Sequence, residues 1–237
     1  MNNNLTEMVF ILDMSGSMLS LTSDTIGGYN SLLKKQRELN KENPELKANV
    51  TTVLFDDRYI VIHDREDLDS VKDITSNEYQ PLGLTAMLDA IGKTVVSVGQ
   101  KLSDTPEEER PGLVSVTIIT DGYENASREY KWDQVRNMIK EQKEKYSWMF
   151  AFIGADIDVE KTSLSLGIDS DMAFNYSKSS AGVDSVYCYT TAAISSARGF
   201  VAQEVTNASY DSVKTVMKDK YNSITVSDNS LTKGSGT

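Results

Sequence analysis

The chain has 237 residues, and its 35 Asp and Glu residues outnumber its 24 Lys and Arg residues, which gives a formal net charge of −11. This charge argues against binding to nucleic acids or to anionic membrane surfaces, since both need clustered cations. A single cysteine, Cys188, excludes an intramolecular disulfide and cysteine-rich metal sites, and a single histidine, His63, excludes any site that needs two imidazoles. Hydrophobic residues make up 39% of the chain, enough for a core of ordinary size.

The start of the chain reads MNNNLTEMVF, without the basic and apolar regions that define a secretory signal peptide. No apolar run approaches the roughly 20 residues that a membrane-spanning helix requires. We therefore expect a cytoplasmic protein that does not contact a membrane.

Short apolar runs alternate with longer amphipathic stretches along most of the chain. Continuous apolar runs are typical of strands buried on both faces, while apolar residues three and four positions apart indicate a helix. In chain order, the expected elements are the strand Met8–Leu12, the helix Asp24–Asn40, the strands Asn49–Phe55 and Arg58–His63, the helix Leu88–Leu102, the strand Leu113–Ile119, the helix Trp132–Tyr146, the strand Trp148–Ile153, the helix Asp158–Leu166, the strand Met172–Asn175 and the helix Ala181–Phe200.

This alternation predicts an α/β fold with a mostly parallel central sheet and helices on both of its faces. The pair Asp56-Asp57 separates two neighbouring strands, which predicts a two-residue hairpin and hence one antiparallel edge strand. The pair Gly27-Gly28 lies inside the first helix, and close approach to the sheet is the simplest reason for it. We expect residues 1–206 to form this domain and residues 207–237 a C-terminal extension that is partly helical or mobile.

The carboxyl ends of parallel strands are where α/β folds bind ligands, because loops from several strands meet there. Functional side chains are therefore expected just after Leu12, Phe55, Ile119 and Ile153. The turn after the first strand carries one carboxylate and two hydroxyls at alternating positions.

Five side chains offer the oxygen atoms that a hard metal ion prefers. Asp13, Ser15 and Ser17 follow the first strand, Asp121 follows a later strand, and Thr85 lies in a loop before the strongest helical stripe. Carboxylate and hydroxyl oxygens suit Mg²⁺, with Mn²⁺ or Ca²⁺ as alternatives, and do not suit a thiophilic metal. The pattern predicts a divalent-cation site. The plainer interpretation is a capped helix start with two incidental aspartates.

In their order and spacing, the segments FILDMSGSM, GLT and TIITDG resemble the von Willebrand factor type A (VWA) domain over about residues 5–200. The resemblance implies a VWA or Rossmann-like fold with a metal-ion-dependent adhesion site (MIDAS), whose ligands would be Asp13, Ser15, Ser17, Thr85 and Asp121. The stretch DTIGGYNSLLKKQ further resembles small stand-alone bacterial or phage members of this family, including relatives of the tellurite-resistance-associated proteins.

This resemblance implies a role in metal-dependent protein–protein interaction inside a bacterial or phage-infected cell, without catalysis by this chain. Hydroxyl ligands leave the charge of the ion only partly neutralised, so an Asp or Glu of a partner protein can complete its coordination shell. We therefore expect a protein partner that offers an acidic residue to the ion.

A Mg²⁺-dependent phosphatase of haloacid-dehalogenase type is the alternative, with Asp13 as its nucleophile and Val116–Thr120 as its second characteristic segment. Such enzymes carry an acidic general acid two residues after the nucleophile. This chain has Ser15 there, which cannot protonate a leaving group in the same way. Thr85 would also have no role in such an enzyme.

The other chemistry-bearing residues are expected to be structural. Asp156 and Asp158 resemble the late acidic loop of such phosphatases, but we expect them to cap and begin a helix rather than form a second cation site. His63 is expected at an exposed or half-buried strand end, which leaves a serine hydrolase without a base. Cys188 is expected to be a small core residue of an amphipathic helix.

Overall fold

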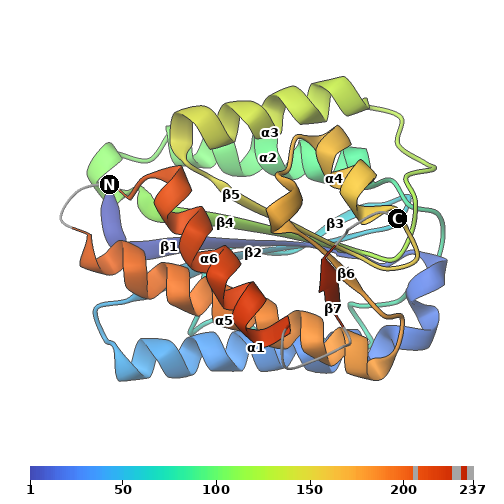
Figure 1. The fold of residues 1–237 in the computed structure, drawn as a ribbon, viewed down its shortest axis with the longest axis horizontal. Helices are drawn as coiled ribbons and strands as arrows, with labels where there is room; N and C mark the ends of the chain where they lie inside the picture. Colours follow the sequence, from blue (N-terminus) through green and yellow to red (C-terminus); the bar gives the residue numbers. More distant parts are fainter. Residues whose placement is uncertain (205–207, 226–230, 234–237) are drawn as a thin grey trace.

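The computed structural model describes residues 1–204, 208–225 and 231–233, which form three layers with a β-sheet in the middle (Figure 1). The strands are β1 (Asn2–Asp13), β2 (Lys47–Phe55), β3 (Tyr59–Asp67), β4 (Pro111–Thr120), β5 (Met149–Gly154), β6 (Ala173–Tyr176) and β7 (Leu231–Lys233). The α-helices are α1 (Thr22–Glu42), α2 (Met87–Ser103), α3 (Trp132–Tyr146), α4 (Val159–Leu166), α5 (Ser180–Gln203) and α6 (Tyr210–Thr225). Short 3-10 helices cover Gly16–Leu21, Glu107–Glu109 and Ser170–Met172.

The sheet has the strand order β3-β2-β1-β4-β5-β6-β7. The five strands from β2 to β6 in this order are parallel, and β3 pairs antiparallel with β2 at one edge. The predicted mostly parallel sheet with an antiparallel edge strand is therefore confirmed. At the opposite edge, the short strand β7 adds a second antiparallel pairing, with β6. Because β1 has β2 on one side and β4 on the other, the chain winds in opposite directions from β1, which makes its carboxyl end a topological switch point.

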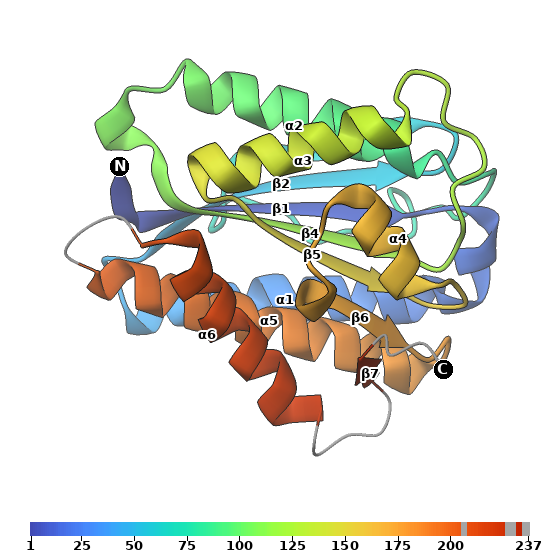
Figure 2. The same cartoon turned by 45° about the horizontal axis from the view of Figure 1, so that its top comes forward.

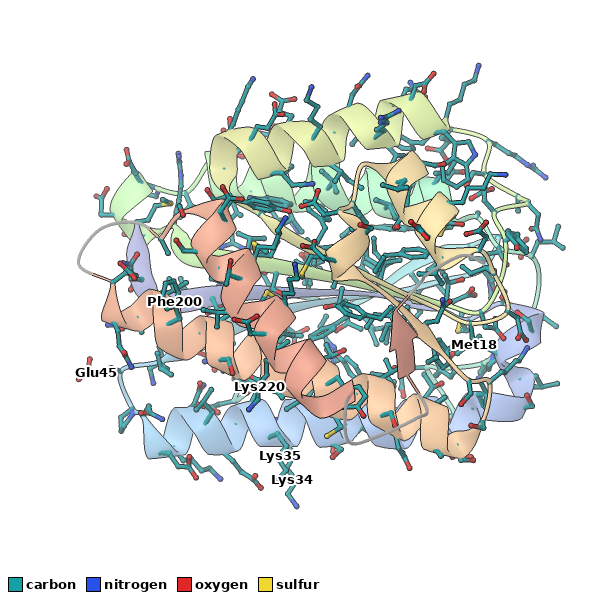
Figure 3. All side chains as sticks on the ribbon, viewed as in Figure 1. Met18, Lys34, Lys35, Glu45, Phe200 and Lys220 are labelled. Carbon is teal, nitrogen blue, oxygen red and sulfur yellow. The ribbon has the colours of Figure 1, made fainter. Side chains whose placement is uncertain are left out.

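Helices cover both faces of the sheet (Figures 1 and 2). The helices α2 and α3 lie over one face, and α1 and α5 lie over the other, with α6 crossing α5. Figure 3 shows Lys34 and Lys35 pointing away from the sheet on the outer side of α1, as the amphipathic pattern requires. Within the described residues, we find no helix that is long and apolar enough to span a bilayer.

The core is built on the apolar runs of the central strands. Each residue of Met8–Leu12 is buried because helices cover both faces of β1. On one face α1 packs closely against α5, and a Cβ atom on Gly28 would lie only 2.2 Å from Cδ2 of Tyr187. The close approach that Gly28 permits is therefore to α5, and the predicted approach to the sheet is wrong.

The hairpin between β2 and β3 has a three-residue loop rather than the predicted two, since Phe55 pairs with Tyr59. The side chain of Asp56 is buried, and Arg58 donates to it from its backbone nitrogen at 2.6 Å and from its guanidinium at 2.5 Å. Arg58, the third loop residue, therefore places its positive charge next to the buried carboxylate of Asp56.

Two predicted environments are wrong. His63 is 6% exposed, with Nδ1 3.0 Å from Thr52 Oγ1, so it is a buried residue rather than an exposed or half-buried strand end. Cys188 is exposed, while its neighbours Tyr187 and Tyr189 are buried. Helix α5 packs against both α1 and α6, so its apolar residues do not define one single face, and its amphipathic pattern does not place Cys188 correctly.

The C-terminal segment is joined to the domain through Asp169, which lies just after α4. Asp169 accepts hydrogen bonds from Lys143 at 2.7 Å, from Tyr210 at 2.8 Å and from Lys214 at 3.1 Å. The latter two belong to α6, within the segment that the sequence predicts to be partly helical or mobile. The predicted boundary at residue 206 and the predicted mobile end at residues 226–230 and 234–237 lie outside the described residues.

Replacing Asp169 with asparagine is expected to destabilise the protein by about 1–3 kcal/mol, because the hydrogen bonds involve charged groups. Burial opposes the ionisation of Asp169, but hydrogen bonds from two lysines and a tyrosine outweigh it and hold its pKa at about 2. Since this pKa lies below the ordinary value of 3.8, the stabilisation is complete above about pH 4 and is lost as the pH falls toward 2. Urea unfolding of both proteins at pH 6 and pH 3 measures this.

The matched control is Glu144→Gln, which breaks an exposed ion pair with Lys140 on α3 and is expected to change stability little. If the free energies of unfolding of wild type and Asp169→Asn differ by the same amount at pH 6 and pH 3, the ionised carboxylate of Asp169 does not stabilise the protein.

Candidate functional site

The predicted site residues come together at the carboxyl end of β1 and β4. Figure 3 labels Met18, just after the first loop, at this end of the sheet. Backbone hydrogen bonds join the loops that meet here: Leu82 N donates to Met14 O at 2.9 Å, and Gly16 N donates to Gly83 O at 3.2 Å. The loop after β1 is thus held against the loop that precedes α2.

Asp13 ends β1 and is fixed from two sides. Its Oδ1 accepts a hydrogen bond from Ser15 N at 2.7 Å, and its Oδ2 accepts one from Thr120 Oγ1 at 2.5 Å. The residue is only 1% exposed. Burial raises the pKa of Asp13 to about 6, although the hydrogen bonds from Thr120 and Ser15 lower it. Among the side chains that the structure describes, no cation is paired with this buried carboxylate.

A line of oxygen atoms connects the first loop to the loop after β4. Ser15 Oγ lies 3.0 Å from Ser17 Oγ, and Ser17 Oγ donates to Asp121 Oδ1 at 2.5 Å. Ser15 and Asp121 are buried, while Ser17 is exposed. The line therefore opens to solvent at Ser17.

Thr85 is brought to the same place by its own loop. Asn125 holds its backbone from both sides, accepting from Thr85 N at 2.9 Å and donating to Thr85 O at 3.0 Å. A Cβ atom on Gly122 would lie 2.9 Å from Thr85 Oγ1 and 3.6 Å from Ser17 Oγ, so both hydroxyls border Gly122. All five predicted residues are therefore neighbours. We refer to the five residues that the sequence predicts as metal ligands, Asp13, Ser15, Ser17, Thr85 and Asp121, as the cation site.

Lys178 is a further residue at the cation site that the sequence did not indicate. It lies between β6 and α5, and its Nζ is 2.7 Å from Asp121 Oδ2, which accepts no aligned hydrogen bond in the described structure. The rule that ligands bind after parallel strands would have pointed to this loop, but only if it had also been applied to β6. Thr120, which holds Asp13, lies within the segment TIITDG but is not among the predicted ligands, and Asn125, which holds Thr85, carries no sequence signal that marks it as part of the site.

The donor set fits a hard divalent cation. Within the described residues, no three His, Cys, Asp or Glu side chains form a metal cluster, so an ion here depends on hydroxyl oxygens as well as on the two aspartates. Adjacent oxygens on an octahedral Mg²⁺ lie about 2.9 Å apart, since Mg–O bonds are about 2.0–2.1 Å. The 3.0 Å separation of the two serine hydroxyls matches this. The buried Asp121 Oδ2 is a further oxygen without an aligned donor.

The acidic loop after β5 has the predicted structural role in part. Asp158 caps α4, accepting a hydrogen bond from Lys161 N at 3.0 Å. Asp156, the predicted cap, instead lies in the preceding loop with a φ of 53°, and Asp158, predicted in the first turn, is the cap. Tyr123, which follows the second aspartate of the cation site, accepts a hydrogen bond from Asp158 N at 3.0 Å. This loop therefore supports the site from outside.

Comparison with solved structures shows the same fold in several proteins of low sequence identity. The pilus adhesin SpaC of Lactobacillus rhamnosus GG is 12% identical over 81% of this chain and 30% of its own, with a TM-score of 0.60. The PilB minor pilin of Streptococcus sanguinis is 12% identical over 84% of this chain and 63% of its own, with a TM-score of 0.55.

The proximal thread matrix protein 1 of the mussel byssus, in a structure with a zinc-occupied MIDAS motif, is also similar. It is 14% identical over 78% of this chain and 44% of its own, with a TM-score of 0.51. This chain thus spans less than two thirds of each of these three proteins. No protein-family model matches the chain, and no curated protein matches it. The fold that these comparisons and the sheet topology define is a VWA-like α/β fold.

Proposed function

We propose that this chain is a divalent-cation-dependent protein-interaction module, whose cation site binds Mg²⁺ and presents it to an acidic residue of a partner. In this proposal the ion would supply a positive charge that bridges two acidic proteins. The VWA-like fold and the MIDAS of one structural neighbour support an interaction module in general. The bacterial and phage proteins that the sequence resembles favour a bacterial cytoplasm, where Mg²⁺ is abundant. Residues 1–206 would form the module.

The observation that carries this proposal is the convergence of three loops on one set of oxygen atoms. Hydrogen bonds of 2.5–3.0 Å join Ser15, Ser17 and Asp121, and the hydroxyl of Thr85 borders the same glycine as that of Ser17. Residues so far apart in sequence have no structural need to share these oxygens, since simple turn caps would satisfy each loop alone.

The surroundings of the cation site favour a protein as the partner. Four of the large apolar side chains that are exposed among the described residues lie in the loops that carry the site: Leu19, Leu82, Leu84 and Tyr123. A groove of about 520 Å³ adjoins the loop of Thr85, and its mostly polar lining combines charged residues such as Arg58 and Asp89 with Leu84. Exposed apolar residues around a polar centre are typical of protein interfaces.

The phosphatase alternative is disfavoured by the environment of Asp13. Asp13 is followed two residues later by Ser15, and not by the acidic residue that such an enzyme uses as its general acid. Ser15, which stands where the general acid is needed, lies 3.0 Å from Ser17 and has no acidic proton to donate. No turnover of a chromogenic phosphate ester is expected in Mg²⁺.

Thr85→Val tests the cation site without disturbing the fold. Valine keeps the shape of the side chain, and the Thr85 hydroxyl makes no hydrogen bond to another residue of the described structure. We expect Mg²⁺ to bind the wild type in a calorimetric titration and to bind Thr85→Val about tenfold to a hundredfold more weakly. Stability in EDTA should not change.

Thr190→Val is the matched control. Thr190 is a fully buried threonine of α5, and its hydroxyl also makes no hydrogen bond with the residues that the structure describes. It should bind Mg²⁺ like the wild type. Partner capture is tested by a pull-down in Mg²⁺ and in EDTA, with Asp13→Ala as the variant that lacks a ligand of the cation site. A protein that is captured equally in all three conditions would contradict a metal-bridged interaction.

A further inference from the structure

The carboxylate of Asp121 is paired with a lysine. Lys178 Nζ lies 2.7 Å from Asp121 Oδ2, the oxygen on the side of the carboxylate away from Ser17. The side chain of Asp121 is 0% exposed, while that of Lys178 is 26% exposed. The ammonium group thus reaches a buried carboxylate from the surface.

We propose that Lys178 is a tethered counter-ion of the cation site, which neutralises Asp121 when the site is empty and is displaced when a divalent cation binds. This inference rests on the proposed function, since it concerns the same site. It makes Lys178 a residue that sets the affinity and the charge selectivity of cation binding.

The physical basis is the cost of leaving two carboxylates together in a buried place. Asp13 and Asp121 are both buried, and two negative charges close together in a buried place repel each other. An unpaired buried charge costs several kcal/mol, and a paired one costs much less. Lys178 supplies one positive charge to one of the two.

A tethered ammonium competes unequally with different cations. A monovalent ion brings the same charge as Lys178 and must also lose water and entropy, so it gains little by replacing the lysine. A divalent ion brings twice the charge and binds several oxygens at once, so it can displace the lysine. The lysine therefore lowers the affinity for all cations and leaves only divalent ions able to bind.

Displacement has a consequence for the lysine itself. Once the ion holds Asp121, the ammonium group loses its partner and is repelled by the metal, so it must move toward solvent. Lys178 lies in a loop between β6 and α5, and Ser179 caps the helix immediately after it through a hydrogen bond from Gly182 N at 3.2 Å. The anchor of the loop is thus a neighbouring residue, and the lysine side chain is free to leave.

Lys178→Met tests the competition, since methionine keeps the unbranched stem and removes the charge. In a calorimetric titration, Lys178→Met is expected to bind Mg²⁺ about fivefold or more tightly than wild type, because the ion no longer has to break the ion pair between Lys178 and Asp121. In EDTA the variant should melt at a lower temperature than wild type, and saturating Mg²⁺ should close this gap.

Lys93→Met is the matched control. Lys93 is a lysine of similar exposure, 31%, whose Nζ pairs with Glu129 Oε1 at 2.6 Å. Its loss removes a positive charge from the same protein but frees no oxygen of the cation site. We expect its Mg²⁺ affinity to differ little from that of wild type, which separates displacement from a general effect of charge.

The wild-type protein gives a second readout that does not depend on any variant. Acylation of lysines with an N-hydroxysuccinimide acetate at constant pH, followed by mass spectrometry of peptides, measures how freely each ammonium group reacts. We expect Lys178 to react faster in Mg²⁺ than in EDTA, and Lys93 to react at the same rate in both.

The outcomes separate this inference from the proposed function. If wild type and Lys178→Met both bind Mg²⁺ with the same affinity, or if the acylation of Lys178 ignores Mg²⁺, the counter-ion role is overturned while the cation site stands. If neither protein binds Mg²⁺, the proposed function fails and this inference fails with it.

Discussion

Replacing Asp13 with asparagine is expected to stabilise the metal-free protein at pH 7 by about 2 kcal/mol and to abolish its response to Mg²⁺. Burial raises the pKa of Asp13 to about 6, above the 3.8 of an unfolded chain. The folded state therefore binds the proton more tightly than the unfolded state does. Ionised Asp13 thus costs stability, in an amount that grows from about pH 4 and is complete above about pH 6.

Asparagine removes the charge without losing the contacts. Its carbonyl oxygen can still accept from Ser15 N, and its amide nitrogen can donate to Thr120 Oγ1, which in turn lies 3.2 Å from Gly122 O. The loss of one carboxylate should remove the metal response, because the remaining ligands of the cation site are three hydroxyls and Asp121 alone.

Thermal or urea unfolding in EDTA and in Mg²⁺ measures both effects. Asp219→Asn is a suitable control, since Asp219 is exposed on α6, and it should leave both stability and metal response unchanged. A variant that is less stable than wild type in EDTA would show that the hydrogen bonds of Asp13 outweigh its burial.

The central strands and the convergence of the five site residues could be predicted because their sequence signals are local. Strands covered by helices on both faces must be continuously apolar, so Met8–Leu12 identifies the buried half of β1 but not its start at Asn2. The oxygen-bearing residues follow directly on these strands, and the shared edge of a parallel sheet brings their loops together. Spacing along the chain is therefore enough to place Asp13 and Asp121 at the same edge of the sheet.

Other features depend on contacts between distant elements, which spacing along the chain does not show. The need for Gly28 comes from the ring of Tyr187, more than 150 residues away. Lys178 follows the shortest of the parallel strands, inside a run of serines that reads as a turn. Arg198 is buried between α5 and α1, where Gln36 accepts its hydrogen bond at 2.8 Å, a position that its charge alone would not suggest.

Solved structures with this fold share only 12–14% of their residues with this chain, so they establish the arrangement of strands and helices and not the chemistry of the site. The chemistry must come from the residues themselves. The cation site combines two buried carboxylates, and among the described side chains a lysine lies beside Asp121 alone. Its behaviour with pH should therefore depend on the carboxylate without a lysine, Asp13.

The affinity for Mg²⁺ is expected to fall by about tenfold for each pH unit below pH 6 and to be constant above about pH 7. A proton on Asp13 competes with the metal ion for the same charge, and burial places the pKa of that proton at about 6. An exposed aspartate, with a pKa near 3.8, would leave the affinity unchanged down to about pH 5.

Calorimetric titrations at pH 5, 6, 7 and 8 measure this dependence. Thr85→Val should show the same pH profile as wild type at lower affinity, because it removes a ligand that does not titrate. An affinity that is flat from pH 8 to pH 5 would mean that Asp13 is already ionised in the folded protein. Its burial would then be compensated by its hydrogen bonds, and the expected gain in stability from Asp13→Asn would disappear as well. The two measurements therefore check a single physical claim, that the empty site holds an uncompensated buried carboxylate.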